Sequence, residues 1–373
     1  MRIGVPREIK DHEFRVGLTP ADVRALCSSG HELLIETGAG HAIGFTDTHY
    51  REAGAKIIAT PQDVYTCELV VKVKEPQAGE VALFHPGMTL FCYLHLAASR
   101  ELTKQLIHSK ACCIAYETVQ DAQGTLPLLT PMSAVAGRLS IQMGAWALTM
   151  ANGGRGVLLS GVPGVAPGRV TIIGGGIVGE NAARIAAGMG SDVTVLDRDP
   201  SRLLFLEKKF GKSVKGVLSG KDQLEQYIRE ADLVIGAVLL PGKQAPKLIS
   251  RALIRSMQPG SVLVDVAIDQ GGCAETSRPT THSNPIYIEE GVVHYCVTNM
   301  PAATARTSTL ALTQATLPYV LALANHGVKQ AMFQDSGLKS GLNICGGQVT
   351  HAALAEDLGM GYRSADQALA ELD

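Results

Sequence analysis

Charge blocks, long apolar runs and paired cysteines are all missing from this sequence, and each absence excludes a class of protein. Charged residues make up 18% of the 373 residues and the formal net charge is -2, which excludes a polybasic nucleic-acid surface. No apolar run approaches the roughly 18 residues of a membrane span, and the opening MRIGVPREIKDHEFR carries too many charges for a signal peptide. The eight cysteines include no CxxC pair, which argues against zinc and predicts a cytoplasmic protein.

The sequence does contain apolar residues for more than one core. Hydrophobic residues make up 46% of the chain, and its length exceeds that at which single cores split into domains. β-Branched runs alternate with helical stretches, which is the pattern of parallel βαβ units. The predicted strands are RIGV, HELLIE, AKII, ELVVKVK, TLFCYLH and CCIAYET in the first half, and RVTII, DVTVLD, SVKGVL, ADLVIGAV, SVLVDVAI and VVHYCV in the second.

We therefore expect an α/β protein of two doubly wound domains. Residues 1–129 form the first part of a discontinuous parallel-sheet substrate domain. Residues 130–305 form a Rossmann dinucleotide-binding domain, and residues 306–373 return to complete the substrate domain.

Helix boundaries are marked by threonine and proline. A threonine N-cap before a proline at the first helical position predicts three helix starts, at Thr19-Pro20, Thr60-Pro61 and Thr130-Pro131. Long helices are predicted over residues 131–152 and over residues 308–327, the second interrupted near Pro318 and leading the chain back to the first domain.

The segment RVTIIGGGIVGENAARIAAGMGSDVTVLDRD has the pattern of a nucleotide-binding turn. Gly174, Gly176 and Gly179 come directly after an apolar strand and open an alanine-rich helix that another strand follows. Gly174 permits a tight turn, Gly176 lets a pyrophosphate approach the backbone, and Gly179 lets helix and strand pack closely. The phosphates would then meet the unpaired N–H groups at the helix N-terminus.

The end of the next strand predicts which dinucleotide binds. Asp197 has the spacing of the carboxylate that binds the adenosine ribose, and its charge would repel a 2′-phosphate. Arg198 and Arg202 are close in sequence and would partly offset that repulsion. We therefore expect NAD, with NADP not excluded.

Four ionisable residues lie at predicted strand ends or in the first loop: Arg15, Lys74, His95 and Asp269. Ligands of open α/β sheets bind beyond the carboxyl ends of the strands, so two facing domains would gather the four in one cleft. Each also has a plainer interpretation. Arg15 would be a solvated loop charge and Lys74 an edge-strand charge, while His95 would be a buried histidine and Asp269 a turn former. Together they suit oxidation of a carbon that bears an amine or alcohol beside a carboxylate.

A set of motifs runs through nearly the whole chain: GVPREIKDHEFRVGLTP, VVKVKEP, YLHLAASRELT, LPLLTPMSAVAGRLS, GGRGVLLSGVPGV, VLVDVAIDQGGC and TNMPAATARTSTLALT. In this order they resemble the alanine dehydrogenases. The resemblance implies NAD-dependent interconversion of L-alanine with pyruvate and ammonium by a homo-hexamer of two-domain subunits. The same chemistry would also allow glyoxylate amination as a secondary reaction.

The resemblance also implies roles for residues at matching positions. It implies substrate binding by Arg15 and Lys74 and catalysis by His95 and Asp269. The implied cofactor contacts, beyond the three glycines, are Ser133, Ile177, Val178, Asp197, Arg202, Ser219, Val238, Leu239, Val266, Ala267, Ile268, Asp269, Arg278, Val297, Thr298, Asn299 and Met300. Some relatives bind magnesium through a glutamate and a histidine; His326 is present here but Ala322 stands at the glutamate position, so no metal is expected.

Two other functions are compatible with much of this pattern. The NAD-binding component of a proton-pumping transhydrogenase has a related fold, but it needs a membrane partner and does not need the four polar residues. A non-catalytic NAD-binding sensor would bind the cofactor and would tolerate loss of His95.

Overall fold

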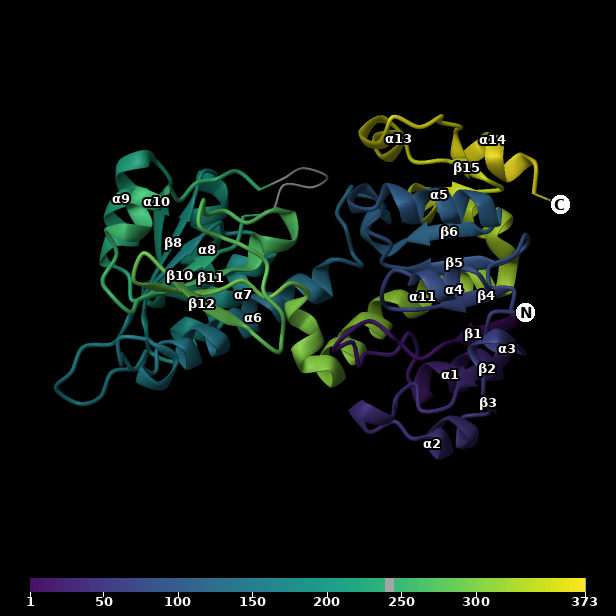
Figure 1. Cartoon of the computed structure of the whole chain (residues 1–373), viewed down its shortest axis with the longest axis horizontal. Helices are drawn as coiled ribbons and strands as arrows, with labels where there is room; N and C mark the ends of the chain where they lie inside the picture. Colours follow the sequence, from purple (N-terminus) through teal and green to yellow (C-terminus); the bar gives the residue numbers. More distant parts are fainter. Residues whose placement is uncertain (239–244, 373) are drawn as a thin grey trace. The chain divides into compact units, whose positions relative to one another are not determined.

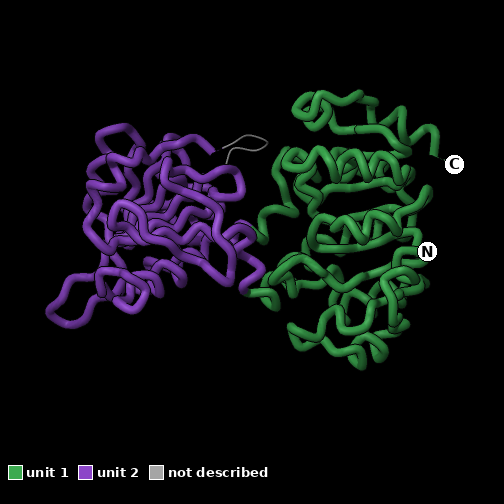
Figure 2. The backbone as a smooth tube through the Cα atoms, in the orientation of Figure 1, with its two compact units in different colours: residues 1–132, 304–373 green, residues 133–303 purple. Residues whose placement is uncertain are grey.

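The computed structural model describes residues 1–238 and 245–372. The chain divides into two compact units (Figure 2): unit 1 is Met1–Met132 with Thr304–Asp373, and unit 2 is Ser133–Ala303. Figure 1 shows that each unit is built on one sheet with helices packed over it.

The sheet of unit 1 has eight strands in the order β15-β14-β6-β5-β4-β1-β2-β3. The six strands predicted in the first half are present and parallel, and two antiparallel strands from the C-terminal segment extend the sheet beyond β6. The strands are β1 (Arg2–Val5), β2 (Glu32–Glu36), β3 (Lys56–Ile58), β4 (Leu69–Val71), β5 (Thr89–Cys92), β6 (Cys112–Ala115), β14 (Leu342–Cys345) and β15 (Gln348–Val349).

Helices cover this sheet, and of the two helix starts predicted here at a threonine N-cap, one has the predicted cap and the other does not. Thr19 caps α1 as predicted, because its hydroxyl accepts the N–H of Asp22. Thr60 precedes α3, but its hydroxyl donates to the Asp63 carboxylate instead of capping a helix N–H. The helices are α1 (Pro20–Ser28), α2 (Asp47–Glu52), α3 (Pro61–Val64), α4 (Ala78–Val81), α5 (Arg100–Ser109), α11 (Ala305–Gln334), α12 (Ser336–Ser340), α13 (Ala352–Leu358) and α14 (Ala365–Ala370), with short 3-10 turns η1 (His41–Ile43), η2 (Leu96–Ala98) and η3 (Tyr116–Thr118).

The return helix α11 breaks at a different residue from the one predicted. It continues through Pro318, where proline removes only one hydrogen bond and buried Thr316 and Val320 hold the helix on either side. The break lies at Gly327, whose φ of 73° and ψ of 164° are non-helical. Glycine adopts a positive φ without a steric penalty, so the helix breaks there instead of at the proline.

The sheet of unit 2 has the strand order of a Rossmann fold. Its order is β12-β13-β11-β10-β7-β8-β9, and all six predicted strands are parallel, with β12 added antiparallel at the edge. The strands are β7 (Arg169–Ile173), β8 (Asp192–Asp197), β9 (Lys215–Leu218), β10 (Leu233–Gly236), β11 (Val262–Asp265), β12 (Ile286–Glu289) and β13 (Val292–Tyr295). The helices are α6 (Thr130–Ala147), α7 (Ile177–Gly188), α8 (Pro200–Phe210), α9 (Lys221–Glu230) and α10 (Arg251–Arg255), and the 3-10 turns are η4 (Met150–Asn152), η5 (Gly211–Ser213), η6 (Val266–Gln270) and η7 (Met300–Thr304).

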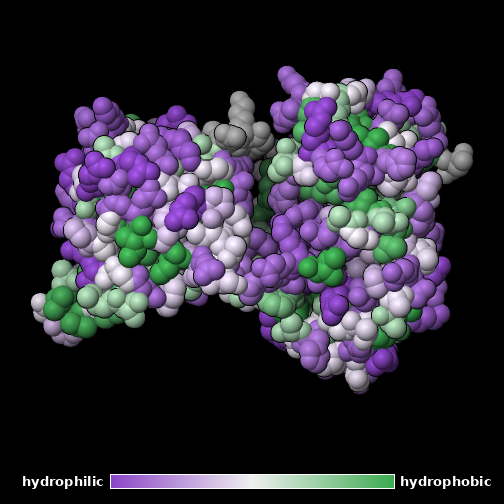
Figure 3. All heavy atoms as spheres, in the orientation of Figure 1, coloured by the Kyte–Doolittle hydropathy of each residue, from purple (hydrophilic) through white to green (hydrophobic). Residues whose placement is uncertain are grey.

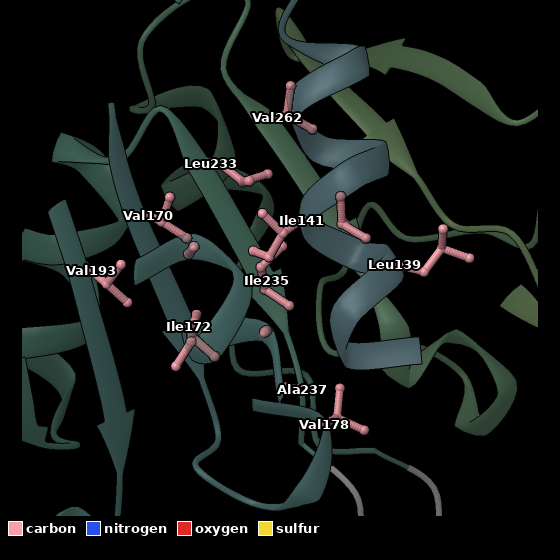
Figure 4. Close-up of a cluster of buried hydrophobic side chains, with 14 of the residues drawn as sticks. Leu139, Ile141, Val170, Ile172, Val178, Val193, Leu233, Ile235, Ala237 and Val262 are labelled. Atoms are coloured by element: carbon pink, nitrogen blue, oxygen red, sulfur yellow. The ribbon is translucent and has the colours of Figure 1, made fainter. Parts of the chain in front are cut away.

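Helix α6 begins at Thr130 and ends at Ala147, so Thr130 is its first residue and not the predicted N-cap, and residues 150–152 form a separate turn. Its Leu139 and Ile141 pack with Ile172 and Ile235 of the sheet in a dry core (Figure 4). Each buried Leu or Ile contributes about 1.5–3 kcal/mol. This core holds β7 and therefore fixes the turn that follows it.

Candidate active site

The turn after β7 has the geometry of a phosphate cradle. Gly174 has a φ of 100°, a conformation that favours glycine. A Cβ on Gly179 would lie 1.8 Å from the Gly174 carbonyl oxygen, so only glycine lets α7 start this close to the strand. Gly176 is the N-cap of α7 and provides no side-chain cap, and a Cβ built on it would meet nothing within 4 Å. The first N–H groups of α7 therefore border open space that suits a pyrophosphate.

The carboxylate of Asp197 shapes the same turn. It ends β8 and accepts the N–H of Gly175 at 2.6 Å and the N–H of Asp199 at 2.9 Å. The Arg202 guanidinium donates to the Gly175 carbonyl and forms an ion pair with Glu180 at 2.5 Å. Because Glu180 pairs with Arg202, Arg202 does not neutralise the carboxylate of Asp197.

The pKa of Glu180 reflects this pairing. Burial alone would raise the pKa, but hydrogen bonds from Lys209 and Arg202 outweigh burial and lower it below the usual glutamate value. Arg202 also lies over the ring of Phe205, with its guanidinium carbon 4.6 Å from the ring centre. The Arg202 guanidinium is thus held by the ion pair with Glu180 and by the ring of Phe205.

The other predicted cofactor residues of unit 2 lie mostly beyond the carboxyl ends of its parallel strands. Ser219 follows β9, Val238 follows β10, residues 266–269 follow β11 and residues 297–300 follow β13, while Ile177 and Val178 open α7 and Ser133 lies in α6. Arg278 lies in a connection and stacks on Tyr287 at 3.9 Å. Leu239 lies outside the described residues.

Asp269 was predicted to end a strand, but β11 ends four residues earlier, at Asp265. The buried carboxylate of Asp265 accepts the N–H of Ala267 and of Cys273 and the hydroxyl of Ser277. These bonds bend the chain into the turn η6 in place of a longer strand. Within η6, the Asp269 carboxylate accepts the N–H of Asn299 at 3.4 Å, which joins the segments that follow β11 and β13.

In unit 1 the structure brings Lys74 and His95 together. The Lys74 Nζ lies 3.3 Å from the His95 Nε2. When the Lys74 amine is protonated it only donates, so Nε2 then accepts and a neutral ring carries its proton on Nδ1. Both residues were predicted to end strands, yet β4 ends at Val71 and β5 at Cys92, each three residues earlier.

Carboxylates end both strands by taking their N–H groups. Glu8 accepts the N–H of Val73 at 2.7 Å, just before Lys74. Glu117 accepts the N–H of Leu94 at 3.1 Å and of His95 at 2.6 Å. Held in this way, His95 adopts the left-handed conformation with φ 49° and ψ 38°, which costs a non-glycine residue about 1–3 kcal/mol.

The imidazole of His95 is exposed and is not a core group. Its ring stacks on that of Tyr93 with centroids 6.0 Å apart, and Tyr93 is anchored by a hydrogen bond from its hydroxyl to the Leu128 carbonyl. Burial raises the pKa of Tyr93, and the nearby Arg15 only partly opposes that effect. Ser99 caps α5, because its hydroxyl accepts the N–H of Leu102.

Arg15 is buried, which excludes its interpretation as a solvated loop charge. Its side chain is 2% exposed and forms an ion pair at 2.5 Å with Glu13, which is 0% exposed. Its Nη1 also contacts the Met132 sulfur at 3.2 Å. A buried guanidinium presents fixed N–H donors of the kind that bind carboxylates.

A buried ionic network supports the loop that carries Lys74. Lys72 contacts Glu8 at 3.2 Å and Glu80 at 2.7 Å, and the Tyr65 hydroxyl donates to Glu80. Burial would lower the pKa of Lys72, but the two glutamates outweigh burial and raise it. Burial raises the pKa of Glu8 although Lys72 opposes it.

Glu75 pairs with the ammonium of Lys74 at 3.5 Å and with Lys10. Burial would raise the pKa of Glu75, but Lys74 and the bond from Lys10 outweigh it and lower the pKa. Sequence reasoning missed Glu13, Glu75 and Glu117. The available signal was that Glu13 and Glu75 stand beside Arg15 and Lys74 in the sequence, and that Glu117 lies near the end of the predicted strand CCIAYET.

Within residues 1–238 and 245–372, no three His, Cys, Asp or Glu side chains gather so as to hold a metal ion. In the same ranges, no helix has both the length and the apolar character needed to cross a bilayer.

Comparison with known proteins gives matches along nearly the whole chain. The domain families described as alanine dehydrogenase/PNT, N-terminal and C-terminal domains, match residues 4–136 and 140–352. An alanine dehydrogenase of Halomonas elongata is 56% identical over 97% of this chain and 98% of its own length. A solved L-alanine dehydrogenase is 51% identical with a TM-score of 0.94, covering 96% of this chain and 99% of that chain. A transhydrogenase of Sinorhizobium meliloti has a TM-score of 0.81 at 22% identity, covering 95% of this chain and 100% of that chain, which shows a shared fold alone.

Proposed function

The chain belongs to the alanine dehydrogenase/PNT family, and on that premise we propose that Arg15, Lys74, His95 and Asp269 carry its reaction. The family and the two-domain α/β fold predicted from the sequence are thereby confirmed. The protein is an oxidoreductase that converts L-alanine, NAD and water into pyruvate, ammonium, NADH and a proton, and it also catalyses the reverse reaction. The observation that carries the assignment of roles is the 3.3 Å contact between Lys74 and His95.

The nucleotide turn of unit 2 fits NAD. Gly174 and Gly179 admit the close approach of strand and helix, and the space beside Gly176 suits the pyrophosphate. Asp197 would accept hydrogen bonds from the adenosine ribose. When bound, NAD supplies the hydride acceptor. The remaining contacts that we propose are Ser133, Ile177, Val178, Arg202, Ser219, Val238, Leu239, Arg278, residues 266–269 and residues 297–300.

The four polar residues bind the substrate and move its protons. Arg15 holds the carboxylate of L-alanine through paired N–H donors, and Lys74 adds a second positive charge. Oxidation at the α-carbon gives an iminopyruvate, to which water adds to form a carbinolamine. His95 accepts a proton from that water and returns it to the amine, so that ammonia leaves and pyruvate forms. Asp269 positions the water or shares the proton.

Replacing His95 tests these roles. The variant His95→Ala should lose roughly 100- to 10,000-fold in kcat, which is the usual contribution of a general acid–base group, while its Kd for NAD stays within a few fold. The control is His108→Ala, in the last turn of α5. Retention of full kcat by His95→Ala would refute the proposed role and favour a protein that binds NAD without this chemistry.

We also propose that the enzyme is a homo-hexamer, with the apolar loop of residues 156–168 as part of a subunit interface. Val162 and Val165 pair across this loop, and with Leu158 they are each more than half exposed. The loop extends at the lower left of Figure 1, and Figure 3 shows apolar atoms there. Apolar groups gathered in this way favour contact with another chain. Light scattering should give six subunits, and Val165→Asp should shift the mass downward.

Two further proposals concern location and substrate range. We place the enzyme in the cytoplasm, which the eight free cysteine thiols support because structural disulfides are rare there. We also propose slow amination of glyoxylate, since it offers the same carbonyl beside a carboxylate. Rates with a small panel of 2-oxo acids would test that range.

A further inference from the structure

Glu13 and Arg15 form a buried ion pair in unit 1. The Arg15 Nε donates to Glu13 Oε1 at 2.7 Å and the Nη2 donates to Oε2 at 2.5 Å. The backbone N–H of Arg15 also donates to Oε1, at 3.1 Å. Glu13 is itself fixed by a turn, because its N–H donates to the Lys10 carbonyl at 3.0 Å. The carboxylate is therefore held by three donors of one residue on a defined loop.

Glu13 binds one edge of the Arg15 guanidinium and so determines which edge can bind another ligand. A guanidinium carries five N–H donors in a rigid plane, and a carboxylate binds it through two parallel bonds. Glu13 takes the edge formed by Nε and Nη2. Because the guanidinium is planar and rigid, this also fixes the direction in which its second bidentate edge, formed by Nη1 and Nη2, points. Met132 also limits rotation, since its sulfur lies 3.2 Å from Nη1.

We infer that Glu13 is a positioning residue that orients Arg15, so that the Nη1–Nη2 edge binds the carboxylate of a 2-amino or 2-oxo acid. This inference rests on the proposed role of Arg15 in substrate binding. Neutralisation of a buried charge would need only one carboxylate oxygen nearby. The two parallel bonds instead fix the plane of the guanidinium as well as its charge.

The variant Glu13→Asp separates orientation from charge. It keeps the negative charge but withdraws the carboxylate by one carbon–carbon bond, about 1.5 Å, so both parallel bonds cannot form. Small misplacements of binding groups cost up to about 100-fold in rate. We expect the KM for L-alanine and for pyruvate to rise roughly 10- to 100-fold, with the KM for NAD unchanged.

A matched control uses the other bidentate pair of the same unit. Arg363 donates to Glu371 through Nη1 at 2.7 Å and through Nη2, on a surface remote in sequence from the site. Glu371→Asp makes the same chemical change there and should leave both KM values unaltered. Thermal unfolding of each variant shows that it is folded.

A double-mutant cycle distinguishes a positioning role from a merely structural one. If Glu13 acts through Arg15, adding Glu13→Asp to Arg15→Lys should raise the KM for pyruvate less than about 2-fold further. Multiplicative effects would overturn the inference, as would an unchanged KM in Glu13→Asp alongside an impaired Arg15→Lys. An unimpaired Arg15→Lys would instead refute the proposed role of Arg15.

Discussion

The carboxylate of Asp197 should decide between NAD and NADP, and Asp197→Asn is the change that tests it. Asparagine keeps the shape of the side chain and an oxygen that accepts the N–H of Gly175, a bond of 2.6 Å in the structure. It removes the negative charge, and its amide NH2 replaces the oxygen that accepts the N–H of Asp199 at 2.9 Å, outside the glycine turn. The glycine turn should therefore keep its conformation while the preference for the cofactor changes.

The size of the effect follows from two contributions. A hydrogen bond from the ribose to a charged acceptor is worth about 1.5–3 kcal/mol and one to a neutral acceptor about 0.5–1.5 kcal/mol, so NAD should bind about 10-fold more weakly. Repulsion between the carboxylate and one charge of a 2′-phosphate about 5 Å away is about 3 kcal/mol at an effective dielectric constant of about 20. Asp197 is partly exposed, so solvent reduces this contribution, and NADP should gain roughly 10- to 100-fold.

The assay is the ratio of kcat/KM for NAD to that for NADP at saturating L-alanine. We expect this ratio to fall by roughly 100- to 1000-fold in Asp197→Asn, the product of the two contributions. Asp192→Asn, an exposed residue at the opposite end of β8, makes the same change and should leave the ratio unaltered. An unchanged ratio in a folded Asp197→Asn variant would refute the assignment of Asp197 to the ribose.

Two further predictions concern the nucleotide turn and the pairing of Lys74. Gly179→Ala places a Cβ 1.8 Å from the Gly174 carbonyl oxygen, so α7 must move and the Kd for NAD should rise about 100-fold in calorimetry. The control is Gly188→Ala, whose added Cβ meets nothing within 4 Å, and this variant should bind NAD as the parent protein does. The pKa of Glu75 is lower in the folded protein than its usual value of 4.5. The pairing of Glu75 therefore adds to the free energy of unfolding above pH 4.5, and this stabilisation is lost as the pH falls through the lower pKa of the folded protein. Urea unfolding of Glu75→Gln should therefore show a flatter loss of stability with acid than the parent protein; an equal slope would contradict the pairing.

The nucleotide turn could be predicted from the sequence because its determinants are local. Gly174, Gly176 and Gly179 are constrained by contacts within one strand–turn–helix unit, and Asp197 ends the next strand. Apolar runs likewise located the strands, because most strands of these parallel sheets are buried on both faces and leave a continuous apolar signal. All of these features are determined by residues that are close together in the sequence.

Features set by distant residues could not be predicted. Lys74 and His95 lie beyond their strands because Glu8 and Glu117, 65 and 22 residues away, accept the N–H groups of Val73 and His95. Nothing in TLFCYLH indicates that the backbone of His95 turns left-handed. Pro318 was a plausible helix break by composition, but packing of α11 overrides it. The spacing of Glu13 and Arg15, two apart in the sequence, was a local signal that went unused, as was the position of Glu75 directly after Lys74.

The most direct test of the central claim is NADH formation by the purified chain alone with L-alanine and NAD. The account predicts an increase in NADH absorbance that requires both compounds, and a decrease when NADH is mixed with pyruvate and ammonium. A chain that binds NAD yet gives no turnover in either direction would contradict it.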